Sequence, residues 1–426
     1  MWRMVTLALV LRFLFVVVFL STTKDTNYTP VSGESYSLSG SDGIVQVGYN
    51  WITNGSYSLI PDGPEIAFRP PLPVFLSGIC TLVTPDYWYV VYIAINCLLG
   101  ALLIKVCSRI FRVLAIPSKI YENLALLAIA IHPYMVFSAK TLTAINLLAF
   151  LMALSTLFLL KALRGDSRSG LYLGLTLGAG ALSHGSFMLL PFFCGFILLV
   201  GGYFQKSLPR ALKSVAVMIV VAMLAIAPWS ARNYDKFRIF IPTASGAGLQ
   251  FWITEDVVAG SFNSTTNSYI KIAADYEKKT GNPMTIQHGG VIDPRQDAEL
   301  AKWGKQLLLA NPGHFFKRAG FGSLGFWAPL DQGFHKALIV GLVNLPLVIA
   351  TILLAGFAVH SWAYNWNATA LLGVCMYIWG IFAAIQAISS YFVMITPLVI
   401  IHGTYLLFLI QHSKVRHSGI HPAVPL

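Results

Sequence analysis

The chain has 426 residues, of which 56% are hydrophobic and only 11% are charged, and its mean hydropathy is +0.68. Soluble domains carry about 25% charged residues, so this composition excludes a protein whose whole surface faces water. The net charge of +12 does not indicate nucleic-acid binding, because the Lys and Arg residues gather beside apolar runs and no basic stripe carries interleaved aromatic residues.

Apolar runs long enough to cross a bilayer as helices recur along the chain, which predicts an all-α polytopic membrane protein. We count ten candidate spans, at about 4–20, 86–106, 119–137, 141–161, 170–184, 187–204, 211–229, 336–358, 367–387 and 391–411. The first contains Arg12 and lacks a convincing cleavage site, so we interpret it as a span rather than a signal peptide. The fifth is short and glycine-rich, which favours close packing against neighbouring helices. We expect one transmembrane domain over 1–426.

Basic residues predict the orientation of these spans. They cluster after spans two, four and six and in the tail, as Lys105, Arg109, Arg112, Lys119, Lys161, Arg164, Arg168, Lys206, Arg210, Lys213, Lys414 and Arg416. With ten alternating spans all of them fall on one side, and the positive-inside rule places that side and both termini in the cytoplasm. Segments 21–85 and 230–335 then form two long outer loops, and 336–426 forms the C-terminal helices. Loops of this length are usually functional.

The cysteines predict neither a disulfide framework nor a metal site, because they show no CxxC spacing and no clustering with histidine. They are Cys80, Cys97, Cys107, Cys194 and Cys375. His184 has no second histidine at ligand spacing, so no metal is expected there, and no cofactor is expected elsewhere.

Several ionisable residues lie at the expected outer ends of the spans. Asp42, between two glycines, suits either a helix N-cap or a general base that activates an acceptor hydroxyl. Arg69 suits either a side chain that extends to lipid headgroups or a phosphate clamp, and the same two interpretations apply to Lys140 and Arg232. His184, between two apolar segments, is more often a helix-end residue than a ligand.

The second outer loop begins where a long apolar run ends in AIAPWSARNYDKF, with Trp229 as an interfacial anchor. Farther on, PTASGAGLQFW contains Gly246 and Gly248, which favour a turn and would also let the backbone approach a substrate. Glu255 and Asp256 follow this stretch and are candidates for contact with a sugar.

Five stretches of the chain occur in a recognisable order. They read YSLIPDGPEIAFRPPLPVFLSG, IHPYMVFSAKTL, GLTLGAGALSHGSFMLLP, APWSARNYDKF and AELAKWGKQLLLANPGHFFKRAGFGSLGFWAP. Over residues 35–335 they resemble the motifs of GT-C-fold membrane glycosyltransferases of the family 39/83 type. That group includes relatives of the protein O-mannosyltransferases and of the aminoarabinose lipid A transferase.

The resemblance implies a GT-C bundle whose donor is a sugar on a polyprenyl phosphate. Asp42 corresponds to the family's base in the first outer loop. Arg69 corresponds to the arginine before the paired prolines, and Arg232 to the arginine of the helix-ending signature. Lys140 occupies an outer turn, and His184 stands where the family usually has an arginine. The resemblance thus implies that these four basic residues hold the donor phosphate.

We therefore predict a divergent glycosyltransferase, because the stretch SSYFVMITP at 389–397 lacks the arginines of the matching family motif. It would move a hexosyl or pentosyl group from polyprenyl phosphate to a lipid, glycan or protein acceptor, with inversion. Its expected partners are the lipid-linked sugar, membrane lipids and the acceptor, at the periplasmic face of a bacterial inner membrane. The alternatives are a flippase or carrier of lipid-linked saccharides and a non-catalytic subunit of an envelope assembly complex, neither of which needs a catalytic carboxylate.

Overall fold

The computed structural model describes residues 1–22, 43–258, 265–284, 286, 291–327, 334–360, 365–385 and 389–417. The helices are α1 (Trp2–Thr22), α2 (Ile44–Asn54), α3 (Pro71–Val83), α4 (Trp88–Val113), α5 (Lys119–Ile131), α6 (Pro133–Phe137), η1 (Ser138–Lys140), α7 (Ile145–Leu163), α8 (Ser169–Ala181), η2 (Gly185–Phe187), α9 (Leu190–Phe204), α10 (Leu208–Phe237), α11 (Ala247–Val258), α12 (Thr265–Thr280), α13 (Pro294–Ala310), α14 (Pro312–Trp327), α15 (Phe334–His360), α16 (Trp366–Ile385), η5 (Ser389–Met394) and α17 (Thr396–His417). The described residues form no β-strand beyond one isolated bridge between Ser58 and Glu65.

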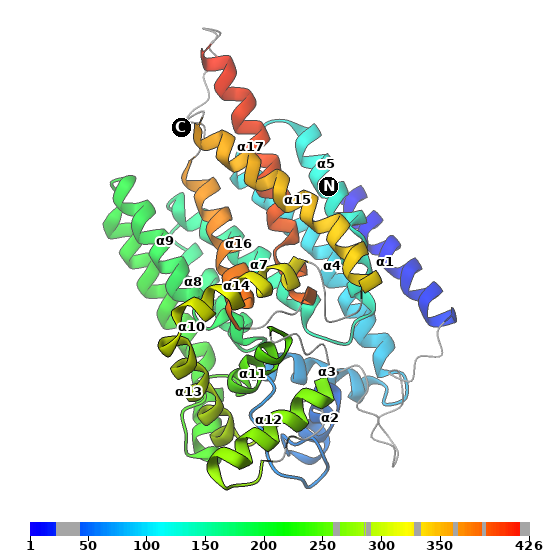
Figure 1. Cartoon of the computed structure of the whole chain (residues 1–426). Helices are drawn as coiled ribbons and strands as arrows, with labels where there is room; N and C mark the ends of the chain where they lie inside the picture. Colours follow the sequence, from blue (N-terminus) through cyan, green and yellow to red (C-terminus); the bar gives the residue numbers. More distant parts are fainter. Residues whose placement is uncertain are drawn as a thin grey trace.

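The helices form two layers (Figure 1). The larger, which we call the bundle, contains α1, α4–α10 and α15–α17 and shares one continuous apolar core. The smaller, which we call the cap, contains α2, α3, α11, α12 and α13 and lies at one end of the bundle. Helix α1 begins, and α17 ends, toward the other end (Figure 1). The predicted all-α polytopic membrane fold is confirmed.

Seven helices in the described part of the chain are long and apolar enough to cross a membrane, and the bent pair α5–α6 would make eight. Each of the ten predicted segments contains a helix, but α8 has only 13 residues and α17 contributes a shorter apolar stretch. The number ten therefore stays a prediction. The bend of 52° between α5 and α6 lies at Pro133, whose ring and missing N–H interrupt a helix.

Glycines set the contact between α8 and α10, as the sequence predicts. A Cβ at Gly170 would lie 2.8 Å from the carbonyl oxygen of Ser214, and one at Gly174 would lie 2.6 Å from that of Met218. These glycines are four residues apart and therefore share one face of α8. Their missing side chains let the two helix backbones touch, which is the usual way that membrane helices pack closely.

The cap has an apolar core of its own, built from both of the long hydrophilic segments. Val47, Ile66 and Phe68 from the first segment pack with Leu249 and Leu300 from the second, and all five are buried. Burial of apolar surface contributes about 25 cal/mol per Å², so this shared core holds together two segments that lie far apart in sequence.

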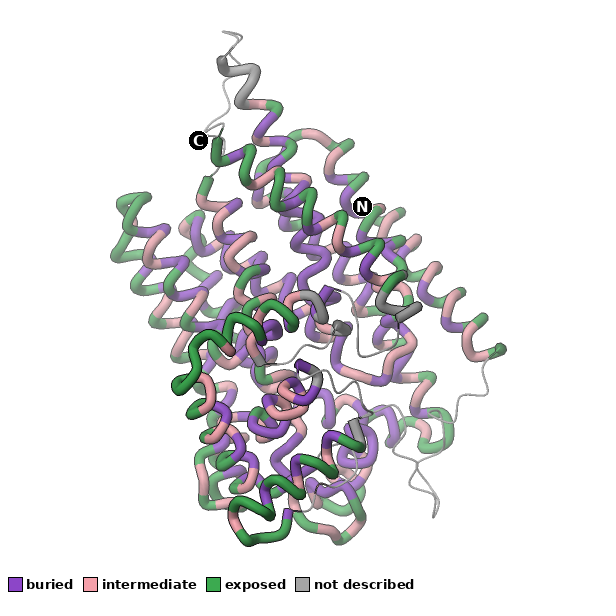
Figure 2. Tube along the Cα trace, in the orientation of Figure 1, coloured by how far each residue is buried: buried purple, intermediate pink, exposed green. Residues whose placement is uncertain are grey.

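Apolar side chains also cover the outward faces of the bundle, where Figure 2 shows rows of exposed residues. In the apolar stretches of α1, α10 and α15 only 22% of the residues are buried. Phe13, Leu224 and Leu353 are each at least 60% exposed. Such faces suit contact with lipid chains, since a water-facing helix would place polar residues there.

Candidate active site

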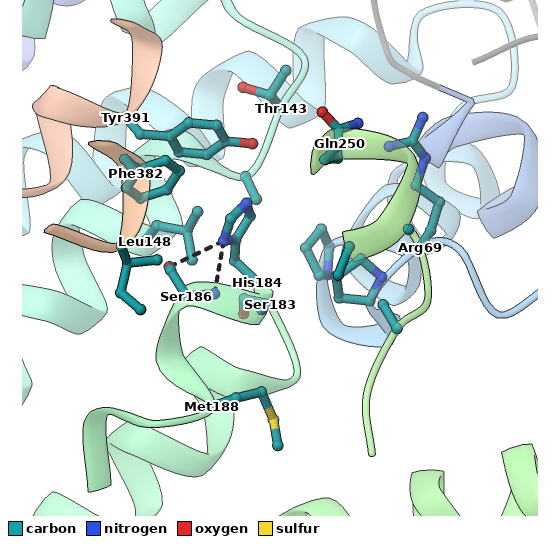
Figure 3. Close-up of a pocket in the computed structure, with 18 of the residues that line it drawn as sticks. Arg69, Thr143, Leu148, Ser183, His184, Ser186, Met188, Gln250, Phe382 and Tyr391 are labelled. Carbon is teal, nitrogen blue, oxygen red and sulfur yellow. Dashed lines mark hydrogen bonds between the residues drawn. The ribbon is translucent and has the colours of Figure 1, made fainter. Parts of the chain in front are cut away.

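A cavity of about 350 Å³ lies between the cap and the bundle. The cap lines it with residues from 44–73 and 244–250, and the bundle lines it with the start of α7, the turn between α8 and α9, and parts of α16 and η5. Two of the predicted phosphate-binding residues, Arg69 and His184, line this cavity. Figure 3 shows His184 on the same side as Phe382 and Tyr391, with Arg69 and Gln250 on the other.

His184 lies in the turn between α8 and η2, where its ring has a defined orientation. Its Nδ1 accepts a hydrogen bond from the backbone N–H of Ser186 at 3.1 Å and lies 3.0 Å from the Ser186 hydroxyl. Because Nδ1 is an acceptor, a neutral ring carries its proton on Nε2, which is the ring nitrogen away from Ser186 in Figure 3. The ring packs against Tyr391, with centroids 4.7 Å apart.

Burial lowers the pKa of His184 to about 4. An imidazole in a site of low polarity loses more from charging than one in water. Near neutral pH the residue is therefore a neutral hydrogen-bond donor through Nε2–H. The corresponding arginine of the family motif would supply a cation. His184 is a cation only when a bound anion raises its pKa.

Arg69 lies in the short segment, bent at Arg69 itself, that leads from the isolated bridge at Glu65 to α3. The hydroxyl of Tyr57 donates to the carbonyl oxygen of Arg69 at 2.9 Å. The N–H of Leu72 donates to the carbonyl oxygen of Leu182 at 2.9 Å, two residues before His184. These two bonds fix the segment at both ends and bring Arg69 and His184 to one cavity across more than a hundred residues of sequence.

Of the two glycines of the second loop, Gly246 lines the cavity, and both are closely packed within the cap. Gly246 has a φ of 111°, and a Cβ there would lie 2.5 Å from the ring of Phe68. A Cβ at Gly248 would lie 2.2 Å from the carbonyl oxygen of Asp297. The Asp297 carboxylate accepts the N–H groups of Gly246 at 2.7 Å and Leu249 at 2.9 Å. A protein carboxylate therefore already caps the start of α11, where a bound anion would otherwise be stabilised.

Arg232 lies outside the lining of the cavity and holds the first loop to α10. It forms an ion pair with Glu65, and its Nη1 donates to the carbonyl oxygen of Ile66 at 3.0 Å. Its guanidinium carbon lies 4.9 Å from the ring centroid of Trp229 and 5.0 Å from that of Tyr57. In this arrangement its charge is compensated by a carboxylate, and its planar group is stacked among aromatic rings.

Lys140 also lies outside the lining of the cavity. Its Nζ is 3.7 Å from the ring centroid of Phe19 and 4.6 Å from that of Phe137. Asp42, the predicted base, lies outside the described residues. It directly precedes Gly43, and the next residue, Ile44, lines the cavity.

Glu255 and Asp256 do not line the cavity either, and each is held by basic residues of the cap and of α14. Glu255 forms an ion pair with Arg318, and its carboxylate lies 2.7 Å from Nε2 of His314. Asp256 is buried and forms an ion pair with Lys271. The predicted contact of the two carboxylates with a sugar stays a prediction, because both side chains have protein partners here.

Sequence reasoning missed the cavity residues that come from α16, η5 and α11. The hydroxyl of Tyr377 donates to the carbonyl oxygen of Ser186 at 3.0 Å, and Phe382 and Tyr391 pack against His184. Tyr391 lies in the stretch that aligned with a late family motif, which was the one signal available for it. Among the described residues that line the cavity there is no Asp or Glu.

The fold, but not the sequence, resembles proteins of known structure. No family model and no curated protein matches the chain. The oligosaccharyltransferase AglB from Archaeoglobus fulgidus, in complex with an inhibitory peptide and a dolichol-phosphate, matches over 98% of this chain with a TM-score of 0.55 and 16% identity. The same archaeal enzyme in its apo form matches over 100% of this chain with a TM-score of 0.55 and 14% identity. The chain has the GT-C fold.

The chain spans about half of the archaeal oligosaccharyltransferase, of which 51% and 52% are covered in these two structures. ArnT from Cupriavidus metallidurans bound to undecaprenyl phosphate gives a lower TM-score of 0.40, with 16% identity over 95% of this chain and 77% of ArnT. At such identities the similarity describes the GT-C fold of this chain and leaves its activity to be argued from its own residues.

Proposed function

We propose that this GT-C chain is a glycosyltransferase whose donor is a sugar linked to polyprenyl phosphate. The observation that carries the proposal is the cavity between cap and bundle, in which Arg69 and His184 offer hydrogen-bond donors among apolar side chains. A guanidinium fork suits a phosphate, and apolar walls suit the adjoining isoprenoid chain. The acceptor would be a lipid, glycan or protein at the periplasmic face of a bacterial inner membrane.

In the proposed reaction the acceptor hydroxyl attacks the anomeric carbon of the donor sugar, and the bond from that carbon to the phosphate oxygen breaks. Asp42 would take the hydroxyl proton as general base, two residues before the cavity-lining Ile44. Polyprenyl phosphate would leave with the bonding electron pair, and attack from the opposite side would invert the anomeric centre. Arg69 would stabilise its charge, and Nε2–H of His184 would donate to a phosphate oxygen.

Lys140 and Arg232 would act at longer range, as basic groups near the cavity rather than in its lining. Glu255 and Asp256 would reach a sugar only by exchanging partners that they hold in the structure. The proposed chemistry therefore needs Arg69, His184 and Asp42. It does not need Lys140, Arg232, Glu255 or Asp256.

The test of this function uses the full chain in lipid nanodiscs with a panel of radiolabelled polyprenyl-phosphate sugars and envelope extract as acceptor. We expect Asp42→Asn to lower the release of polyprenyl phosphate by about 10²- to 10⁴-fold, the range for a lost general base. Asp62→Asn is the matched control, because Asp62 is an exposed carboxylate of the same loop that does not line the cavity. Asn tolerates its left-handed φ of 57°.

Equal release by the two variants would remove Asp42 from the mechanism. No release by wild type with any donor would contradict the transferase and favour a carrier or a non-catalytic subunit.

A further inference from the structure

A second cavity, of about 170 Å³, lies at the opposite ends of the helices that line the first. It is formed by the turn that joins α7 to α8 and the turn that joins α9 to α10. Its polar rim contains Arg164, Gln205, Ser207 and Arg210. It is separate from the proposed transferase site, and nothing in the proposed reaction uses it.

Helix α7 extends from one cavity to the other, so its length gives the distance between them. Ile145, at its first turn, lines the first cavity, and Leu163, at its last residue, lines the second. A helix of 19 residues is about 28 Å long. The hydrocarbon core of a bilayer is about 30 Å thick, so the second cavity lies at the other membrane surface.

The backbone of the α7–α8 turn brings the two arginines of the rim together. Gly165 has a φ of 86°, and a Cβ there would lie 2.6 Å from Nη1 of Arg210. The guanidinium of Arg210, from α10, therefore lies against the turn that carries Arg164. No acidic residue is among the described residues that line this cavity, so its positive charge has no carboxylate within the lining. Two guanidinium groups around one small cavity favour a shared anion.

Apolar residues identify the kind of anion. Leu163, Leu198 and Ala211 also line the cavity, but all three are buried and offer it little surface. Tyr203 and Phe204, at the end of α9, are exposed beside it, where aromatic side chains commonly mark the level of lipid headgroups. A phosphate joined to a glycerol and acyl chains would satisfy the arginines and place its acyl chains beside these exposed aromatic rings.

We propose that this second cavity binds the phosphate group of an anionic phospholipid, such as phosphatidylglycerol, in the leaflet on the side where α1 begins and α17 ends. The two arginines hold the phosphate, Gln205 and Ser207 contact the glycerol headgroup, and the acyl chains pass Tyr203 and Phe204. Basic pockets between membrane helices are known to select such headgroups.

The test uses the full-length protein in nanodiscs of phosphatidylcholine with one quarter phosphatidylglycerol. Retained phosphatidylglycerol is counted by native mass spectrometry after release from the discs. We expect the double variant Arg164→Gln/Arg210→Gln to retain roughly tenfold less of it than wild type, since each basic residue near an anionic surface contributes severalfold to the affinity. Arg109→Gln/Arg112→Gln is the matched control, because it removes two exposed arginines from the end of α4, outside the cavity.

A loss confined to the first double variant supports the site. Equal losses in both double variants would overturn it, because they would show general attraction to the surface. Displacement of the lipid by millimolar glycerol phosphate would also overturn the lipid assignment in favour of a soluble phosphate ligand. If the glutamine variant fails to fold, Arg164→Lys/Arg210→Lys keeps the charge and removes the forks, and unchanged retention in it would contradict a phosphate held by guanidinium groups.

Discussion

Arg69 in the cavity and Arg232 at the cap–bundle contact sit on the same face of the molecule but have different surroundings. Arg69 shares its cavity with the neutral donor His184 and with no described carboxylate. Arg232 is paired with Glu65 and stacked on aromatic rings. Arg318, on α14, has surroundings like those of Arg232. It pairs with Glu255 of α11 and donates to the carbonyl oxygen of Ala384 in α16 at 2.7 Å.

The difference shows that residue type and membrane side do not identify a phosphate-binding arginine. What matters is whether the guanidinium lines a cavity that can hold a ligand, as Arg69 does and Arg232 does not. A paired arginine gains little from a phosphate, because the carboxylate would have to give up its partner in a partly buried place. Arg69 instead lines a cavity, where a charge-assisted interaction with a bound phosphate would fit its guanidinium.

The largest expected effect is a loss of stability when the buried Arg318 is replaced. Arg318→Met should lower the free energy of unfolding by about 3 kcal/mol, because it leaves Glu255 in a largely buried site with only His314, at 2.7 Å, as a partner. Chemical denaturation in mixed micelles, followed by tryptophan fluorescence, measures this. Lys271→Met is the control. It removes the ion-pair partner of Asp256, which neighbours Glu255 on α11, but Asp256 keeps the Ser268 hydroxyl as a donor at 2.8 Å. A loss below 1 kcal/mol for Arg318→Met would show that the pair does not hold the cavity walls.

The next effect separates Arg69 from Arg232 directly. Arg69→Gln should lower transfer by about 10²- to 10³-fold with little change in stability, as expected when a donor to developing charge is removed. Arg232→Gln should act mainly on stability, by about 1–3 kcal/mol, because Glu65 is left with a weaker partner, Lys236, at 3.3 Å. Turnover and denaturation of both variants decide between them. Should a folded Arg232→Gln lose transfer as fully as Arg69→Gln, both arginines would belong to the phosphate site.

Much of the fold could be predicted from the sequence, because hydropathy and length dominate the behaviour of a chain in a bilayer. The ten apolar segments all contain helices, and the two hydrophilic segments pack together as the cap. The glycines of α8 pack on α10 as predicted. The sequence also indicated the shortness of the fifth segment, which contains α8, whereas hydropathy alone did not give the bend that Pro133 introduces into the third.

The candidate site could be predicted only in part. Arg69 and His184 do meet in one cavity, which motif order suggested. The pairing of Arg232 with Glu65 joins residues 167 apart, and no local pattern encodes such a contact. The same holds for Asp297, whose carboxylate caps α11 from α13. Tyr391 lines the cavity although it lies late in the sequence, because tertiary packing alone brings it there.

The smallest expected effect concerns His184, and it tests whether the cavity holds a neutral donor or a cation. His184→Gln keeps an N–H donor, so transfer at pH 7.5 should stay within about threefold of wild type. His184→Leu removes the donor and should cost about 3- to 10-fold, the value of one hydrogen bond. If the residue acted as a cation at pH 7.5, both variants would lose transfer equally.

Stability against pH gives the independent reading of the same residue. The folded pKa of about 4 is below the usual 6.5, so between these values the unfolded chain binds a proton that the folded chain excludes. The stability due to the neutral ring is thus complete above pH 6.5 and is lost as the pH falls toward 4. We expect the melting temperature of wild type to fall more than that of His184→Gln over this window, measured in the same micelles. Parallel curves for the two proteins would mean that the ring titrates at its ordinary pKa, and His184 could then meet the donor phosphate as a cation, as the arginine of the family motif does.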